Sequence, residues 1–240
     1  MHEYQFKVTN PYEKWRAETM FTKEAGTIAW LRAVVQPGDV VWDVGANVGI
    51  YTILAADLVG ALGMVFAFEP HAPSLCTLVE NVALNEYQDR VKVLASALHA
   101  DEGFIPFNWT HLKAGTSGHQ LGHCYTENGV LFQPAATVLV YGVAADYLVE
   151  ELVVLPPDVI KIDVDGNELA VLDGMRATLE QHPRTVQVEV HPQNADIIKQ
   201  VMEKRGFALS LEHHTEIGKR SIAEGADPKA VFRNAIYNRV

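Results

Sequence analysis

The sequence predicts a doubly wound α/β domain, with a mostly parallel seven-stranded sheet and helices on both faces. Short apolar runs alternate with longer segments of helical periodicity, and turn residues separate the two kinds of segment. A loop with two glycines also follows the first apolar run directly. Strands that alternate with helices require crossover connections, and these produce parallel sheets that helices cover on both sides.

The strands are expected where short apolar runs are bounded by turn residues. These runs are residues 40–43, 64–68, 91–94, 158–164, 185–190, 207–211 and 231–237. A helix is expected from about Val48, and Gly206 stands where the last long helix would end. Three more helices are indicated by apolar positions three or four apart: Leu75, Leu78, Val79 and Val82; Leu169, Leu172, Met175 and Leu179; Ile197, Ile198, Val201 and Met202.

Length and composition fit one compact domain over residues 1–240, with an N-terminal helical extension over 1–37. The net charge of −11 argues against binding nucleic acid or anionic lipid by bulk electrostatics. No apolar leader and no run of about 20 apolar residues is seen, so no membrane span is expected. Cys76 and Cys124 are expected to be free thiols in a cytoplasmic protein. The oligomeric state stays open, with a homodimer as one option.

The loop after the first strand reads Asp43-Val-Gly45-Ala-Asn47-Val-Gly49. In doubly wound sheets, ligands bind at the carboxyl ends of the strands, where the strand order reverses. Glycines there permit a sharp strand-to-helix turn and let a ligand approach the backbone closely. This loop is therefore a candidate ligand site.

Glu69 and Pro70 follow the second strand. Glu69 lies 20 residues after Gly49, which is the spacing typical of an acid that accepts hydrogen bonds from both hydroxyls of a ribose. The strand, the glycine loop, the helix and the spaced acid together predict an adenosine site.

The loop favours S-adenosylmethionine over a dinucleotide as the adenosine ligand. Dinucleotide loops have the pattern G-x-G-x-x-G, whereas Asn47 occupies the place of the middle glycine here. Asp43 would repel a phosphate, but it would attract the ammonium and sulfonium groups of S-adenosylmethionine. In the alternative interpretation, Asp43 only caps the following helix and the glycines only turn the chain.

The chain resembles the FkbM-type methyltransferases, which are S-adenosylmethionine-dependent enzymes of the Rossmann-like class I methyltransferase fold. Members typically methylate hydroxyl groups on sugars or on secondary metabolites such as polyketides. The resemblance therefore implies O-methylation of a small hydroxylated molecule. It spans roughly residues 40–192 with a gap, in the blocks VVWDVGANVGIYT, FAFEPHAPSLCTLVENVALN, VLASALHADEG, DVIKIDVDGNELAVLDGMRATLE and VQVEVHP.

The resemblance also implies roles for single residues. Glu69 would hold the ribose, and Ser96 and Ala97 would border the adenine. Asp165 departs from the family pattern, which more often has a glutamate there. The residues implied at the methionine end of the cofactor are Asp43, Gly45, Asn47 and Gly49.

Methyl transfer to an alcohol needs a positioned acceptor and a group that takes its proton. Asp163 and Asp165 close the fourth strand, and Glu189 and His191 close the fifth. We expect His191 or Glu189 to be the base, although His191 can alternatively pack beside Pro192 and bind a carbonyl. Asp163 is expected to contact the cofactor or the acceptor, because an exposed aspartate with a pKa near about 3.9 is a weak base.

No metal is expected. The acidic run from Asp163 to Glu168 lacks the sixth-position glycine and the distant glutamate of a calcium loop. A magnesium site at Asp163, Asp165 and Glu189 remains an alternative. A zinc site is disfavoured because the candidate ligands have no second pair at metal spacing: His119, His123 and Cys124.

Residues 104–141 interrupt the α/β alternation and are expected to form an insertion on the substrate side. The insertion can wall an acceptor pocket, or it can be an edge hairpin or lid without ligand contact. Its candidate pocket residues are Trp109, His111, Lys113, His119, His123, Tyr125 and Phe132, together with the run from Gly115 to Gly118.

Two other functions remain open beside methyl transfer to a small molecule. One is an NAD-dependent oxidoreductase that uses the same loop, and the other is a non-catalytic partner subunit that binds the cofactor. The fold alone does not decide between them. A nucleic-acid methyltransferase is disfavoured by the acidic composition and by the lack of an Asn-Pro-Pro-Tyr-like element after the fourth strand.

Overall fold

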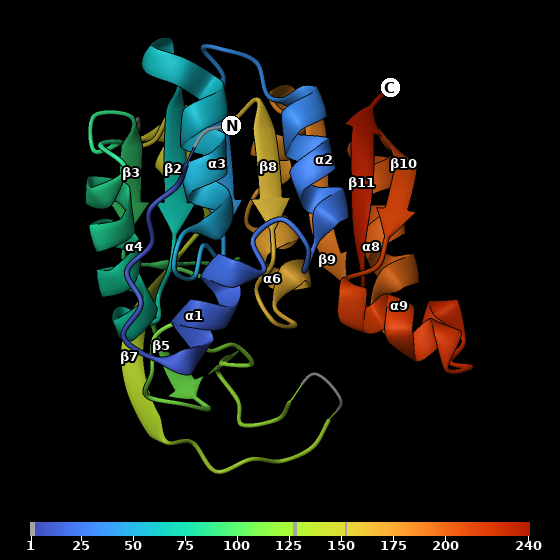
Figure 1. Cartoon of the computed structure of the whole chain (residues 1–240). Helices are drawn as coiled ribbons and strands as arrows, with labels where there is room; N and C mark the ends of the chain where they lie inside the picture. The colour runs from blue at the N-terminus through green and yellow to red at the C-terminus, as the bar shows by residue number, and fades with distance from the viewer. Residues whose placement is uncertain (1–2, 127–128, 152) are drawn as a thin grey trace.

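The computed structural model describes residues 3–126, 129–151 and 153–240, and a seven-stranded sheet lies at its centre (Figure 1). The strands are β1 (Val40–Val44), β2 (Met64–Phe68), β3 (Val91–Leu94), β8 (Val159–Ile162), β9 (Thr185–Val190), β10 (Phe207–His213) and β11 (Arg233–Arg239). Their order is β10-β11-β9-β8-β1-β2-β3. Strand β11 runs antiparallel to both of its neighbours, and the other six strands are parallel to one another. The predicted fold class is confirmed.

Helices cover both faces because neighbouring strand residues point in opposite directions. The helices are α1 (Pro11–Glu18), α2 (Ala25–Val34), α3 (Ile50–Val59), α4 (Ala72–Leu84), α5 (Ala145–Glu150), α6 (Glu168–Asp173), α7 (Arg176–Gln181), α8 (Ala195–Lys204) and α9 (Glu216–Ala223), with short 3-10 turns η1 (Gly60–Leu62) and η2 (Pro228–Ala230). Val41 packs in a core with α2, α3 and α4, whereas Trp42 packs in a second core with α5, α6, α7 and α8. Within the described ranges, no helix is long and apolar enough to cross a bilayer.

The helix expected around Leu169 to Leu179 is two helices, α6 and α7, with a break at Gly174. The cause is a side chain from α5. The Asp146 carboxylate accepts hydrogen bonds from the backbone of Ala177 at 3.0 Å and of Thr178 at 2.7 Å, so it satisfies the first amides of α7. The backbone N–H of Asp146 in turn donates to the carbonyl of Gly174 at 3.0 Å.

A second, smaller sheet lies at the carboxyl ends of the parallel strands (Figure 1). It has the order β4-β7-β5-β6, and three of its four strands lie in or at the borders of residues 104–141. The sequence did not predict this sheet. Its strands are β4 (Ala97–Leu98), β5 (Gly103–Trp109), β6 (Gln120–Leu121) and β7 (Ala136–Val143).

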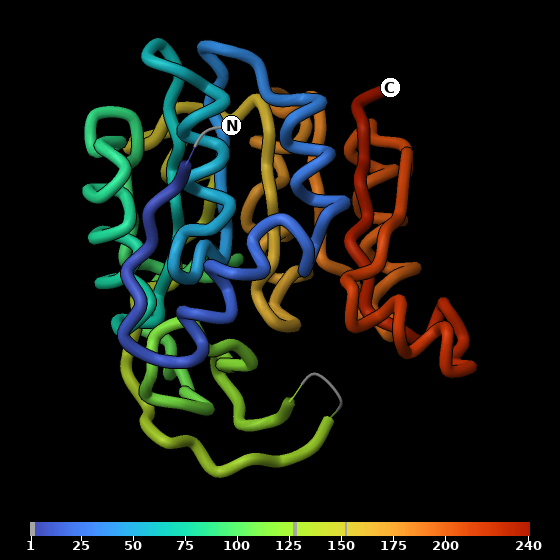
Figure 2. Tube along the Cα trace, viewed as in Figure 1, coloured from blue at the N-terminus to red at the C-terminus, as the bar shows by residue number. Residues whose placement is uncertain are grey.

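The N-terminal segment runs beside α4 and then places α1 at the same end of the large sheet (Figure 2). Asn10 and Glu13 form a capping box that starts α1. Glu13 is buried, and its carboxylate also accepts a hydrogen bond from Thr77 of α4 at 2.8 Å. Helix α1 is therefore fixed near the end where ligands bind in this fold.

Gly45 lets the carboxyl ends of β1 and β8 come together. Its φ is +78°, a left-handed conformation that favours glycine, and a Cβ atom there would lie 1.8 Å from the carbonyl oxygen of Asp163. The amides of Gly45 and Ala46 both donate to the carbonyl of Phe68 in β2, at 3.0 Å each. The strand order reverses between β1 and β8, so this turn forms the floor of the crevice there.

Gly45→Ala should lower the free energy of unfolding by more than about 3 kcal/mol, because left-handed strain and a backbone clash add together. The matched control is Gly206→Ala, since Gly206 has a φ of +81° and open space around it. That change should cost only about 1 to 2 kcal/mol. Urea unfolding of both variants measures the difference, and equal losses would show that the close contact with Asp163 does not constrain residue 45.

Candidate active site

Two cavities adjoin at the carboxyl ends of β1 and β8 and share part of their walls. Gly45, Asn47, Asp163 and Asp165 belong to the walls of both cavities. The first cavity is also lined by Glu69, Pro70, Ser96, Ala97, Leu98, Phe107, Thr116, His119 and Leu121. The second is also lined by Arg16, Lys23, Tyr51, Ser117, Lys161 and Glu189.

Glu69 is buried at the end of β2 and faces the first cavity. One carboxylate oxygen accepts the amide of Asn47 and the other accepts the amide of His71, both at 2.7 Å. Burial raises the pKa of Glu69 to about 7, and these two amide bonds act in the opposite direction. Each carboxylate oxygen can accept a further hydrogen bond, so the group fits a ligand with two neighbouring hydroxyls.

Most of the residues expected to bind the cofactor line the first cavity, but two do not. The cavity includes Gly45, Asn47, Glu69, Pro70, Ser96, Ala97 and Asp163. Gly49 instead begins α3, where a Cβ atom would lie 2.4 Å from Leu78, so the glycine allows close helix packing. Asp43 likewise lines neither cavity.

Asp43 is part of a buried ion pair. Its side chain is 2% exposed, and one carboxylate oxygen accepts a hydrogen bond from Thr52 at 2.6 Å. The other oxygen lies 3.4 Å from the ammonium of Lys161, which is also 2% exposed. Lys161 therefore offsets the charge of Asp43. Any attraction for a cationic ligand falls to the acids that do face the cavities.

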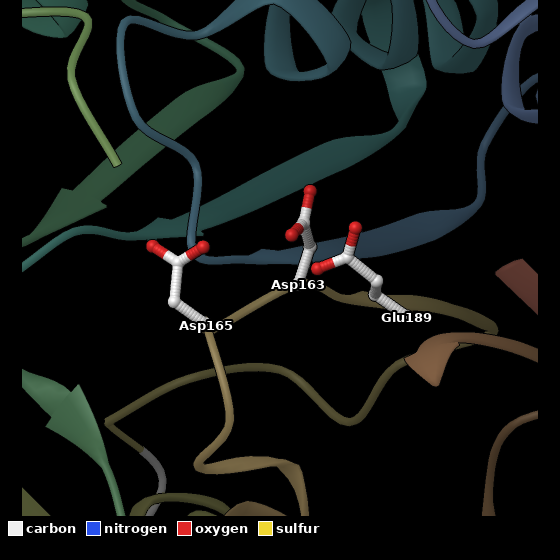
Figure 3. A group of neighbouring side chains, drawn as sticks. All are labelled: Asp163, Asp165 and Glu189. Atoms are coloured by element: carbon white, nitrogen blue, oxygen red, sulfur yellow. The ribbon is translucent and has the colours of Figure 1, made fainter. Parts of the chain in front are cut away.

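Three carboxylates, of Asp163, Asp165 and Glu189, gather at the ends of β8 and β9 (Figure 3). Each offers an oxygen atom within 4.8 Å of the others, and the figure shows Glu189 pointing toward Asp163. Asp163 and Glu189 share a side-chain hydrogen bond. In the described residues this is the one group with three potential metal ligands, and its oxygen donors match those that magnesium prefers.

The environment drives the pKa values of Asp163 and Glu189 apart. The Lys161 ammonium, 3.2 Å from Asp163, holds the pKa of that carboxyl below its usual range. Burial and the charges of Asp163 and Asp165 raise the pKa of Glu189 well above its usual range. In their shared hydrogen bond, Glu189 is therefore the proton donor and Asp163 is the ionised acceptor. Such a split marks candidate acid and base groups.

Asn47 and Asp165 attach the insertion to the ends of the large-sheet strands. Both have left-handed backbones, with φ of +51° and +52°, a conformation that Asn and Asp tolerate better than most residues. The side-chain amide of Asn47 donates to the carbonyl of Thr116 at 2.7 Å, and the Asp165 carboxylate accepts a hydrogen bond from the backbone N–H of Gly118 at 2.7 Å. The side chain of Gln120 also donates to the carbonyl of Asp165. These bonds place residues 116–121 over both cavities.

His191 lies outside both cavities. Its ring packs edge-on against Phe232, with the centroids 4.3 Å apart, and its buried Nε2 atom has no hydrogen-bond partner among the described residues. Burial lowers the pKa of His191. Of the two bases expected from the sequence, Glu189 is the one that faces a cavity.

The insertion contributes fewer pocket residues than its composition indicated. Of the candidates, His119, Thr116 and Ser117 reach the cavities, and the insertion adds Phe107 and Leu121, which the sequence did not single out. His119 packs against His71 with ring centroids 4.1 Å apart, and burial lowers its pKa to about 3. Trp109 is buried in the core of the small sheet, and the other candidates His111, Lys113, His123, Tyr125 and Phe132 line neither cavity.

Sequence reasoning missed all three cations of the second cavity, Lys161, Arg16 and Lys23. Lys161 had a signal, because it is a lone charged residue inside the apolar strand β8. Arg16 had none, since only the tertiary position of α1 brings it to the cavity.

Comparisons with known proteins show the family of this chain. The family model described as "Methyltransferase FkbM domain" matches residues 43–209. The chain is 31% identical over 187 residues to the hexuronic acid methyltransferase AglP of Haloferax volcanii. The aligned region covers 78% of this chain and 70% of that protein.

Two solved structures share the fold. The methyltransferase FkbM of Methylobacillus flagellatus aligns with a TM-score of 0.53 and 14% identity, covering 96% of this chain and 56% of that one. The magnesium protoporphyrin IX methyltransferase of Synechocystis, solved with bound SAM, also has a TM-score of 0.53 and 14% identity, covering 99% of this chain and 88% of that one. The family match spans more than half of the chain and includes Asp43, Glu69 and Glu189. The chain belongs to the FkbM methyltransferase family and is a methyltransferase.

Proposed function

We propose that the protein transfers a methyl group from S-adenosylmethionine to a hydroxyl group of a small molecule. The favoured acceptor is a sugar or a glycolipid. The observation that carries the proposal is the placement of Glu69 and the carboxylates of Asp163, Asp165 and Glu189 around Gly45. A sugar acceptor is supported by the related hexuronic acid methyltransferase of H. volcanii.

The first cavity suits the nucleoside part of the donor. Glu69 is placed to accept hydrogen bonds from both ribose hydroxyls, and Pro70, Ala97 and Phe107 offer apolar surface for the adenine. Asp163 and Asp165, where the cavities meet, would attract a sulfonium or ammonium group and repel a pyrophosphate. This acidic wall disfavours NAD and an oxidoreductase. When bound, S-adenosylmethionine supplies a methyl group that its positive sulfur activates for transfer.

The second cavity suits the acceptor. The chain holds an acceptor hydroxyl there beside Glu189, and the oxygen forms its bond to the methyl carbon as the bond from sulfur to that carbon breaks. Ionised Glu189 takes the hydroxyl proton, and the raised pKa makes it a stronger base than an ordinary carboxylate. Asp163 stays ionised beside Lys161, and it accepts a hydrogen bond from Glu189 only while Glu189 carries a proton, which includes the proton taken from the acceptor. The alternative is a magnesium ion bound by the three acids. It is the less favoured of the two, because Lys161 already supplies a cation beside Asp163.

We place the protein in the cytoplasm as a single domain, with residues 1–37 as an N-terminal helical extension and residues 104–141 as an insertion on the substrate side. The free thiols of Cys76 and Cys124 support a reducing compartment. The third candidate function, a non-catalytic partner subunit, predicts donor binding without turnover. A labelled-methyl transfer screen over sugars, glycolipids and polyketide alcohols tests it directly.

Glu69→Gln should weaken S-adenosylmethionine binding about 10- to 100-fold at pH 8, because hydrogen bonds to a charged acceptor are lost. In the wild type, affinity should also fall as the pH drops through 7, since Glu69 becomes protonated below its raised pKa. Isothermal titration calorimetry measures both effects. Glu80→Gln on the exposed side of α4 is the matched control and should bind normally. Unchanged affinity in Glu69→Gln would remove Glu69 from the donor site.

Glu189→Gln should lower kcat about 100-fold or more while donor binding persists, because the proton acceptor is lost. Below the raised pKa of Glu189 the side chain is protonated and cannot act as a base. The wild-type kcat/KM should therefore rise with pH through that pKa, and the rise should vanish in Glu189→Gln. The comparison variant is His191→Gln, whose pH profile should keep the rise. If His191→Gln loses it instead, His191 is the base.

A further inference from the structure

The second cavity has walls of opposite charge. Asp163, Asp165 and Glu189 stand on the strand side, where Lys161 is already paired with Asp43 and Asp163, whereas Arg16 from α1 and Lys23 stand on the N-terminal side. An anionic molecule in this cavity is repelled by the ionised acids of the strand side and attracted by the two cations of the N-terminal side. The wall charges therefore favour a single orientation for a ligand that carries a negative group at one end.

Arg16 is held in place by the insertion. Its Nε–H donates to the carbonyl of Gly115 at 2.5 Å, which fixes the plane of the guanidinium. Among the described residues, neither of its terminal amino groups has a hydrogen-bond partner or an acidic partner. The positive charge acts against the burial that raises the pKa of both Glu69 and Asp165, so its field reaches the two cavities.

Other cations of the chain have partners that Arg16 lacks. Arg184 pairs with Asp39, Arg205 pairs with Glu180, and Lys23 lies 2.7 Å from Glu24. A fixed, half-buried guanidinium with two free amino groups matches the geometry of a carboxylate, which accepts two parallel hydrogen bonds from it. Arg16 therefore has the form of an anion-binding group that faces a cavity.

We propose that Arg16 binds a carboxylate on the methyl acceptor, so that the enzyme acts on an acidic sugar. This inference rests on the proposed function and adds the acceptor's charge and its direction in the site. The carboxylate lies toward α1, and the reacting hydroxyl lies toward Glu189 at the strand ends. Arg16 is then a specificity-determining residue that selects a uronate over the corresponding neutral sugar.

The test compares methyl glucuronoside with methyl glucoside, which differ by a carboxylate in place of a hydroxymethyl group. Calorimetry on the full chain saturated with S-adenosylhomocysteine should show the glucuronoside binding about tenfold or more tightly. Arg16→Gln should remove this preference, and Arg16→Lys should keep part of it. Arg220→Gln on the exposed side of α9 is the matched control and should leave the preference intact. Thermal unfolding confirms that each variant is folded.

Other results overturn the inference in distinguishable ways. Equal affinity for the two sugars, or no binding of the glucuronoside, shows that the acceptor is not selected by a carboxylate, while the proposed function stands if the wild type binds S-adenosylmethionine. If Arg16→Gln instead weakens binding of S-adenosylmethionine and leaves the sugar preference intact, Arg16 holds the carboxylate of the donor's amino-acid tail. If the wild type binds no S-adenosylmethionine, the proposed function fails and this inference fails with it.

Discussion

The buried ammonium group of Lys161 is the interaction on which the active end of the sheet depends. It lies between Asp43 of β1 and Asp163 at the end of β8, 3.4 Å from one carboxylate and 3.2 Å from the other. These two strands are neighbours at the point where the strand order reverses. Without a cation there, the buried carboxylate of Asp43 and the partly buried one of Asp163 would have no counter-charge, at a cost that proteins avoid by pairing or by neutralising such groups.

The same ammonium sets the roles of the acids that face the cavities. Lys161 keeps Asp163 ionised. The negative charge of Asp163 then disfavours a second negative charge on its neighbour Glu189 and, together with burial, raises the pKa of Glu189. A carboxylate that stays ionised thus stands beside one that exchanges protons more readily. The ion pairs of Lys161 with Asp43 and Asp163 therefore influence the pKa values of the acids that face the cavities.

The features that local sequence determines were predictable. The seven strands are short apolar runs between turn residues, and Glu69 has a fixed spacing from the glycine loop, so the fold and the first cavity followed from pattern. Features that depend on tertiary contacts were not. The sequence showed Asp43 at the mouth of the loop, but it could not show that this carboxylate is buried in an ion pair with Lys161.

Three further differences have the same origin. The split between α6 and α7 comes from Asp146, a residue more than 20 positions away. The small sheet forms by pairing β5 with β7 across a long loop, which periodicity does not report. His191 follows a strand that ends at the site, yet its ring turns to Phe232, and no pattern in the sequence gives the direction of that ring.

The attachment of the insertion through Asn47 and Asp165 has a consequence for ligand entry. The segment from Thr116 to Gln120 is held by hydrogen bonds to residues that also line the cavities. A molecule that contacts Asn47 or Asp165 binds to the same residues that hold this segment in place. By thermodynamic linkage, a ligand that strengthens these hydrogen bonds gains the same free energy in its own affinity. The affinity of the site therefore depends on the stability of this segment as well as on the groups that touch the ligand.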